Sequence, residues 1–101
     1  MAESLTVRAF QDLIRERYYA TDAARGVPGT FMWLIEEVGE LATALHTCAR
    51  PEATEADRAN LAEEFADVVA WLATLANIAD VDLAAALAKY TDPDRVKGVK
   101  S

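Results

Sequence analysis

The chain has 101 residues and a mass of 11.0 kDa, which fits a single domain spanning 1–101. Its net charge of −7 disfavours nucleic acid as a partner, because phosphate backbones bind basic surfaces. The single cysteine, Cys48, excludes an internal disulfide and a cysteine-based zinc site. We find neither a signal-peptide pattern nor an apolar run of membrane-spanning length, and therefore expect a cytoplasmic protein with no membrane partner.

The composition favours an all-α fold. Hydrophobic residues make up 52% of the chain and 21 of them are alanine, whereas only 8% of residues are aromatic. Apolar residues recur at spacings of three and four, which predicts four helices. We expect helices at about 5–20 (capped by Ser4), 30–48, 55–79 (with a capping box of Thr54 and Asp57) and 83–90 (capped by Asp80 or Asp82), a loop at 21–30 and a basic tail at 91–101.

The apolar stripes of these helices are broad for so short a chain. The residues expected to face the core are Phe31, Leu34, Val38, Leu41 and Leu45 in the second helix, and Leu61, Phe65, Val68, Leu72 and Leu75 in the third. A single copy would leave apolar patches of the kind that mark interfaces. We therefore expect a helical bundle assembled from several copies, as a homo-oligomer with twofold symmetry.

Two carboxylate pairs lie at the edges of these stripes. Glu37 and Glu40 belong to the run Glu36–Glu40, and Glu64 and Asp67 repeat the same spacing in the third helix. Residues three apart lie about 60° apart around a helix and about 4.5 Å apart along its axis. Because a short connection makes neighbouring helices antiparallel, we expect the two pairs to face each other.

Four facing carboxylates repel one another and require a counter-charge. No lysine or arginine lies between Arg25 and Arg50, or between Arg58 and Lys89. The missing cation is most simply a divalent metal, and carboxylate oxygens suit Mg²⁺, with Mn²⁺ as the alternative. Either motif alone is common on solvated helix faces; the two motifs together, without basic neighbours, predict a metal site.

The combined pattern, WLIEEVGELATAL followed by EEFADVVAWL, resembles the MazG-like nucleotide pyrophosphohydrolases of the all-α NTP pyrophosphatase superfamily. The resemblance covers about residues 30–90. It implies Mg²⁺-dependent hydrolysis of a nucleoside triphosphate to the monophosphate and pyrophosphate, and a role in nucleotide-pool housecleaning. It also favours a tetramer built as a dimer of dimers, with a dimer as the alternative.

Individual residues take roles from this resemblance. Glu37, Glu40, Glu64 and Asp67 would be the metal ligands, and Glu36 an accessory catalytic carboxylate. Lys89 matches the basic residue that the family has after its last helix, and Arg95 is a candidate for a second basic contact. Pro93 and Asp94 stand near the position where the family often has asparagine.

Two tryptophans lie on the same helix edges as the carboxylates. Trp33 precedes Glu37 by one helical turn, and Trp71 follows Asp67 by one turn. Either ring could stack on a nucleobase, and either could equally pack in the core or against another subunit.

A second function from another class is compatible with the sequence. The chain could be a non-catalytic helical oligomerisation module that has an acidic or metal-binding face. Detecting nucleoside monophosphates after incubation with deoxynucleotides and Mg²⁺ separates the two. The chain has no P-loop pattern GxxxxGK[ST], which argues against an ordinary NTPase.

Overall fold

The computed structural model describes residues 4–95, and all of its regular elements are helical. They are α1 (Val7–Cys48), α2 (Glu55–Ile78), α3 (Leu83–Leu87) and the 3-10 helix η1 (Ala88–Tyr90). The all-α prediction is therefore confirmed. The tail residues 96–101 lie outside the described part of the chain.

Helix α1 bends sharply at Gly26, so that it forms two arms, residues 7–25 and 27–48. Gly26 has φ 81° and ψ 175°, a backbone conformation that other residues adopt only under strain. Pro28 follows in the first turn of the second arm, where a missing N–H breaks no helical hydrogen bond. The predicted loop at 21–30 is wrong, because one non-helical glycine suffices for the bend. The described residues accordingly contain three α-helices and not four.

The helix starts follow the capping rules, with two corrections. Thr6, and not Ser4, caps α1 by accepting a hydrogen bond from the Ala9 N–H at 3.0 Å. Thr54 and Asp57 form the predicted capping box of α2, with reciprocal hydrogen bonds of 2.9 and 3.1 Å. Asp82, and not Asp80, caps α3.

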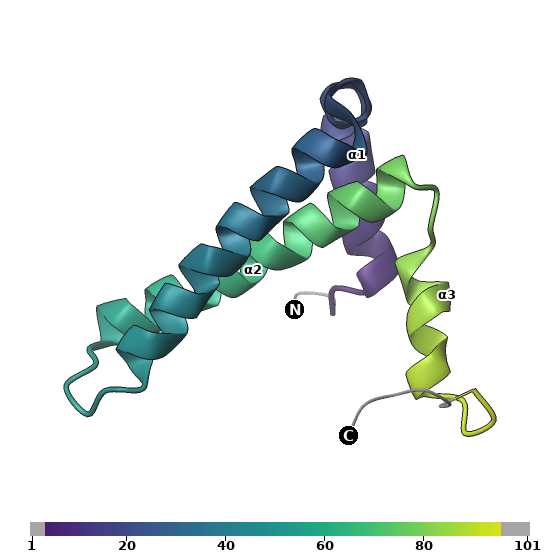
Figure 1. Cartoon of the computed structure of the whole chain (residues 1–101). Coiled ribbons are helices and arrows are strands. Elements are labelled where there is room, and N and C mark those ends of the chain that lie inside the picture. Colours follow the sequence, from purple (N-terminus) through teal and green to yellow (C-terminus); the bar gives the residue numbers. More distant parts are fainter. Residues whose placement is uncertain (1–3, 96–101) are drawn as a thin grey trace.

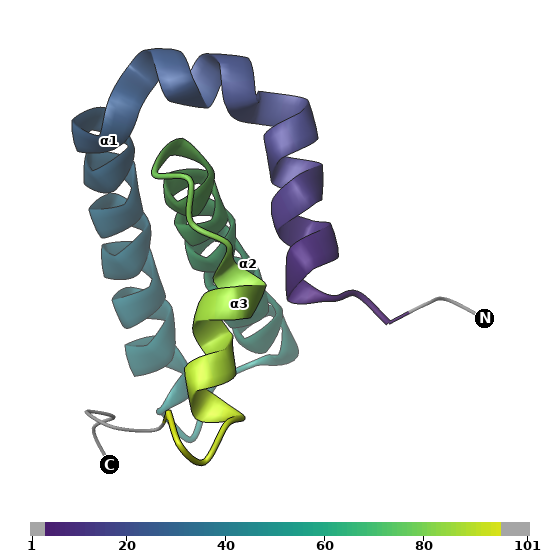
Figure 2. The same cartoon turned by 90° about the vertical axis from the view of Figure 1, so that its right-hand side faces the viewer.

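The two arms of α1 lie on either side of α2 (Figures 1 and 2). The second arm runs antiparallel beside α2 along most of its length, as predicted for the two carboxylate helices. The segment Leu83–Tyr90 leaves α2 at an angle of 109°. Within residues 4–95 no single helix is long and apolar enough to cross a membrane, although α2 and Leu83–Tyr90 meet that criterion when counted together across their bend.

A buried amide pair fixes the first arm against the C-terminal end of α2. Gln11 Nε2 donates to Asn77 Oδ1 at 3.1 Å and to the Val81 carbonyl at 2.7 Å. Gln11 Oε1 accepts from the Leu83 N–H at 3.0 Å, which also ties α3 to this point. Because both amides are buried, these bonds set the angle of the first arm.

The apolar core of one chain is small. Its buried hydrophobic residues are Ile14, Leu34, Ala44, Ala73 and Ala76. Leu34 is thus the one residue of the two predicted stripes that is buried. Five of the predicted core residues are instead exposed: Phe31, Val38, Leu45, Phe65 and Leu72. The second arm and α2 bury only the inner edges of their stripes.

Candidate metal centre

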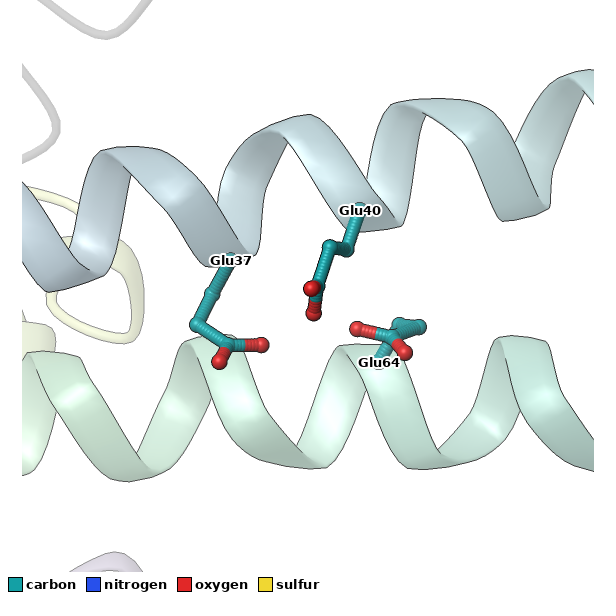
Figure 3. A group of neighbouring side chains, drawn as sticks. All are labelled: Glu37, Glu40 and Glu64. Atoms are coloured by element: carbon teal, nitrogen blue, oxygen red, sulfur yellow. The ribbon is translucent and has the colours of Figure 1, made fainter.

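Three carboxylates from two helices converge at the seam between the second arm of α1 and α2. One carboxylate oxygen each of Glu37, Glu40 and Glu64 lies within 4.8 Å of the others. Figure 3 shows Glu37 and Glu40 reaching down from α1 and Glu64 reaching up from α2. The spacing of three within α1 places its two glutamates on one side of the helix, and the antiparallel packing brings Glu64 opposite.

Two oxygens of this cluster are buried without a hydrogen-bond partner, Oε2 of Glu37 and Oε2 of Glu64. Burial raises the pKa of Glu37 from 4.5 to about 7, with further contributions from the neighbouring Glu40 and the charges of Asp67 and Glu64. Burial and the charges of Glu40 and Asp67 also raise the pKa of Glu64. Burial and the neighbouring carboxylates thus disfavour ionisation of Glu37 and Glu64.

Asp67 belongs to the same electrostatic environment but stands outside the close group. Its charge acts on both Glu37 and Glu64, yet its oxygens are not among those that converge within 4.8 Å. Of the four predicted ligands, the structure brings three together and places the fourth as a neighbour.

No cation of the chain compensates this charge within residues 4–95. The ion pairs in that part are Arg8–Asp82 and Arg25–Asp22, and neither involves the cluster. Buried carboxylates without partners are costly unless they are neutralised. The donor set is entirely oxygen, which is the set that Mg²⁺ and Mn²⁺ prefer. The residues therefore fit a divalent metal.

A polar hollow of about 300 Å³ continues from the cluster towards the turn between α1 and α2. Glu40 and Glu64 form one end of it, and Thr43, Thr47 and Asn60 supply uncharged hydrogen-bonding groups further along. These three residues were not predicted from the sequence. They lie on the same sides of the two helices as Glu40 and Glu64. Helical spacing from these glutamates could therefore have identified them.

The two tryptophans meet at the other side of the cluster. The rings of Trp33 and Trp71 are stacked, with centroids 6.2 Å apart and planes 10° from parallel. Trp33 is 46% exposed and Trp71 is half-buried, so the pair offers an accessible aromatic surface one helical turn from Glu37 and Asp67.

Arg25 is the cation nearest to this aromatic pair and was missed in the sequence. Its guanidinium lies 5.0 Å from the Trp71 ring centroid, its Nη2 donates to Asp22 at 2.7 Å, and its Nε donates to Thr30 at 3.0 Å. The segment was interpreted as a loop, whereas the spacing of three between Asp22 and Arg25 indicates a helical ion pair once the segment is recognised as helix.

The remaining candidates lie apart from the three converging carboxylates. Glu36 is exposed on α1. Lys89 lies in η1, beyond the 109° bend, and its ammonium is 5.3 Å from the Tyr90 ring centroid. Arg95 is exposed near the end of the described chain.

The family model of the MazG nucleotide pyrophosphohydrolase domain matches residues 28–92. The chain belongs to the MazG family. The match covers the second arm of α1, α2, α3 and η1, and therefore every carboxylate of the cluster and both tryptophans. A search of curated proteins finds no match. Membership of this family supports nucleotide pyrophosphohydrolase activity as the general function.

Proposed function

We propose that this protein hydrolyses ribo- or deoxynucleoside triphosphates to the nucleoside monophosphate and pyrophosphate, with Mg²⁺ as cofactor. The observation that carries the proposal is the group of Glu37, Glu40 and Glu64, in which one oxygen each of Glu37 and Glu64 is buried without a partner, and which lacks a counter-ion among the described residues. These three side chains would hold the metal, with Asp67 contributing its charge and Mn²⁺ as a substitute ion. Bound there, Mg²⁺ would neutralise negative charge on the triphosphate.

The residues around the cluster divide the remaining work. Water attacks the α phosphorus, the bond to the β-phosphate oxygen breaks, and pyrophosphate leaves. Glu36 or Glu63, which are both exposed and directly precede Glu37 and Glu64 in the sequence, accepts the proton of the attacking water. Trp33 and Trp71 contact the nucleoside. Lys89 and Arg95 both lie beyond the bend after α2. They therefore contact the phosphate of a nucleotide that is bound by another subunit. Housecleaning of the cytoplasmic nucleotide pool is the role that fits this chemistry.

The products test the proposal. We expect deoxynucleoside monophosphates and pyrophosphate when the protein is incubated with a mixture of deoxynucleoside triphosphates and Mg²⁺. In ¹⁸O-labelled water the label should appear in the monophosphate, because attack at the α phosphorus places the water oxygen there. Label in pyrophosphate would move the attack to the β phosphorus, and a nucleoside diphosphate product would contradict the assignment.

The exposed apolar surface supports assembly into a dimer or a dimer of dimers. An apolar groove of about 450 Å³ runs between the start of the chain and α2, lined by Leu5, Val7, Phe10, Phe65 and Val69 among others. Four of these five side chains are exposed in one copy, at 44% or more. Apolar surface of this extent is rarely left open in a monomer, and a second copy of the chain would cover it.

Light scattering tests the assembly. We expect a multiple of 11.0 kDa at roughly micromolar concentration. Val69→Glu should shift the mass towards one chain, because it places a charge in the apolar groove, whereas the same change at the exposed Ala56 should leave the mass unaltered. A wild-type mass of 11.0 kDa would rule out the oligomer.

A further inference from the structure

A second hollow, of about 330 Å³, lies between the first arm of α1 and α2. Its walls include Ile14 and Tyr18 from α1 and Trp71 and Thr74 from α2, and Asp22 and Arg25 also line it. The walls are largely apolar and aromatic, and the charged groups are confined to this pair. Such a combination suits a flat, mostly apolar ligand that carries a few polar atoms on one edge.

Asp22 is the unusual residue of this hollow. It is only 5% exposed, and its Oδ1 accepts a hydrogen bond from Arg25 Nη2 at 2.7 Å. Its Oδ2 is buried and has no partner among the described residues. A buried carboxylate oxygen without a donor is costly, so a ligand N–H that reaches this oxygen would relieve that cost.

Arg25 holds that acceptor in place. Its Nε donates to Thr30 at 3.0 Å, and its guanidinium lies 5.0 Å from the Trp71 ring centroid. Gly29 leaves room for the Arg25 side chain, since a Cβ there would approach Arg25 Cγ to 2.9 Å. Asp22 and Arg25 thus form a fixed pair, in which a free acceptor stands beside a donor group.

The hollow adjoins the metal centre through Trp71. Trp71 lies seven residues after Glu64 on α2, two helical turns or about 10 Å along the axis. A nucleotide whose phosphates lie at the carboxylates can therefore place its base in this hollow. This step rests on the proposed function.

We propose that this hollow is the base subsite and that Asp22 selects bases with an exocyclic amino group over uracil and thymine. An exocyclic amino group can donate an N–H to Asp22 Oδ2 without placing a carbonyl oxygen against the carboxylate. The only ring N–H that uracil and thymine offer at that edge is flanked by two carbonyl oxygens, and one of them would face the carboxylate. Asp22 is thus a specificity-determining residue.

Deoxycytidine and deoxyuridine triphosphates are the matched test pair, because they differ only at C4, where cytosine has an amino group and uracil a carbonyl, and at N3, where cytosine has a bare nitrogen and uracil an N–H. For the wild type we expect kcat/KM for dCTP to exceed kcat/KM for dUTP by at least about tenfold. One hydrogen bond to a charged group contributes enough free energy for a ratio of that size. Asp22→Asn replaces an acceptor with a side chain that also donates, and should bring the ratio to within about threefold of unity by raising KM for dCTP. Asp12→Asn, an exposed change on the same arm, should leave the ratio as in the wild type.

Two outcomes would overturn the inference. One is a wild type that hydrolyses dCTP and dUTP equally well, a result that requires no variant. The other is an Asp22→Asn protein that loses activity equally on both nucleotides, because Asp22 would then act only by supporting Arg25. Thermal melting of each variant reports whether the fold is retained.

Calorimetry with the monophosphates dCMP and dUMP separates this inference from the proposed function. Tighter binding of dCMP that is lost in Asp22→Asn would support the base subsite even if no triphosphate were hydrolysed. Equal binding of the two monophosphates by a wild type that hydrolyses other triphosphates would overturn the subsite and leave the proposed function standing.

Discussion

Replacing Glu64 with glutamine should lower Mg²⁺-dependent turnover by about 10³-fold and leave the fold intact. A metal ion contributes several kcal/mol of charge stabilisation in the transition state, and about 1.4 kcal/mol corresponds to each tenfold of rate. Glutamine keeps the shape of the side chain but removes the charge that would hold the ion. Glu37→Gln, Glu40→Gln and Asp67→Asn should act in the same direction, and Asp67→Asn most weakly, because Asp67 stands outside the converging group.

A loss of turnover alone would not distinguish a metal ligand from a residue needed for folding. The distinction comes from the metal-free protein, in which removing one charge relieves repulsion among the carboxylates. The melting temperature of metal-free Glu64→Gln should therefore equal or exceed that of the wild type. Glu16→Gln, an exposed change on the first arm, is the matched control and should retain full activity. An active Glu64→Gln protein would argue strongly against the metal site.

The carboxylate cluster could be predicted from the sequence because its determinants are local. The spacing of three within each helix fixes which side chains share a face, and the short connection after Cys48 fixes the antiparallel packing. The absence of lysine and arginine around the glutamates predicted an uncompensated cluster, and the two ion pairs among residues 4–95 both lie elsewhere. The exclusion of Asp67 from the closest group depends on side-chain positions, which spacing alone does not fix.

The bend of α1 could not be predicted in the same way. Two glycines and a proline within 21–30 are typical of a loop, but only Gly26 leaves the helical conformation. Pro28 is accommodated because it falls in the first turn after the break. The position of Arg25 against Trp71 depends on this bend, and so does the hollow that contains Asp22. Because residues 21–30 were predicted to be a loop, the positions of Asp22 and Arg25 beside Trp71 could not be predicted.

The core was overestimated for a different reason. Periodicity indicates which side of a helix is apolar, but it does not say whether that side is covered by the same chain or by another. Phe31, Val38 and Phe65 follow the predicted stripes, yet all three are exposed in one copy. Their exposure turns a prediction about the core into an argument for assembly.

The stability of the metal-free protein should fall as the pH rises through the range in which Glu37 ionises. Its pKa is about 7 in the folded chain against an ordinary value of 4.5, so between these values the folded state binds more protons than the unfolded state. The associated stability is fully present below 4.5 and is lost as the pH rises through about 7. Glu64, whose pKa is also raised, adds a contribution of the same sign. Thermal melting without metal should therefore give a lower melting temperature at about pH 8 than at about pH 5.5, and Glu37→Gln should reduce the difference.

The stabilisation of the protein by Mg²⁺ should depend on pH in the opposite direction, because the ion and the protons compete for the same oxygens. At about pH 8 Glu37 is largely ionised, and saturating Mg²⁺ should raise the melting temperature by roughly 5–10 °C by mass action. At about pH 5.5 Glu37 is protonated, so the same concentration should raise the melting temperature much less. The metal should thus raise the melting temperature of the wild type most at the pH at which the metal-free protein is least stable. The melting temperature of Glu37→Gln should rise little at either pH. A shift of equal size at both pH values, or one that persists in Glu37→Gln, would place the ion elsewhere on this acidic protein, since the pKa of Glu37 ties its own site to this pH range.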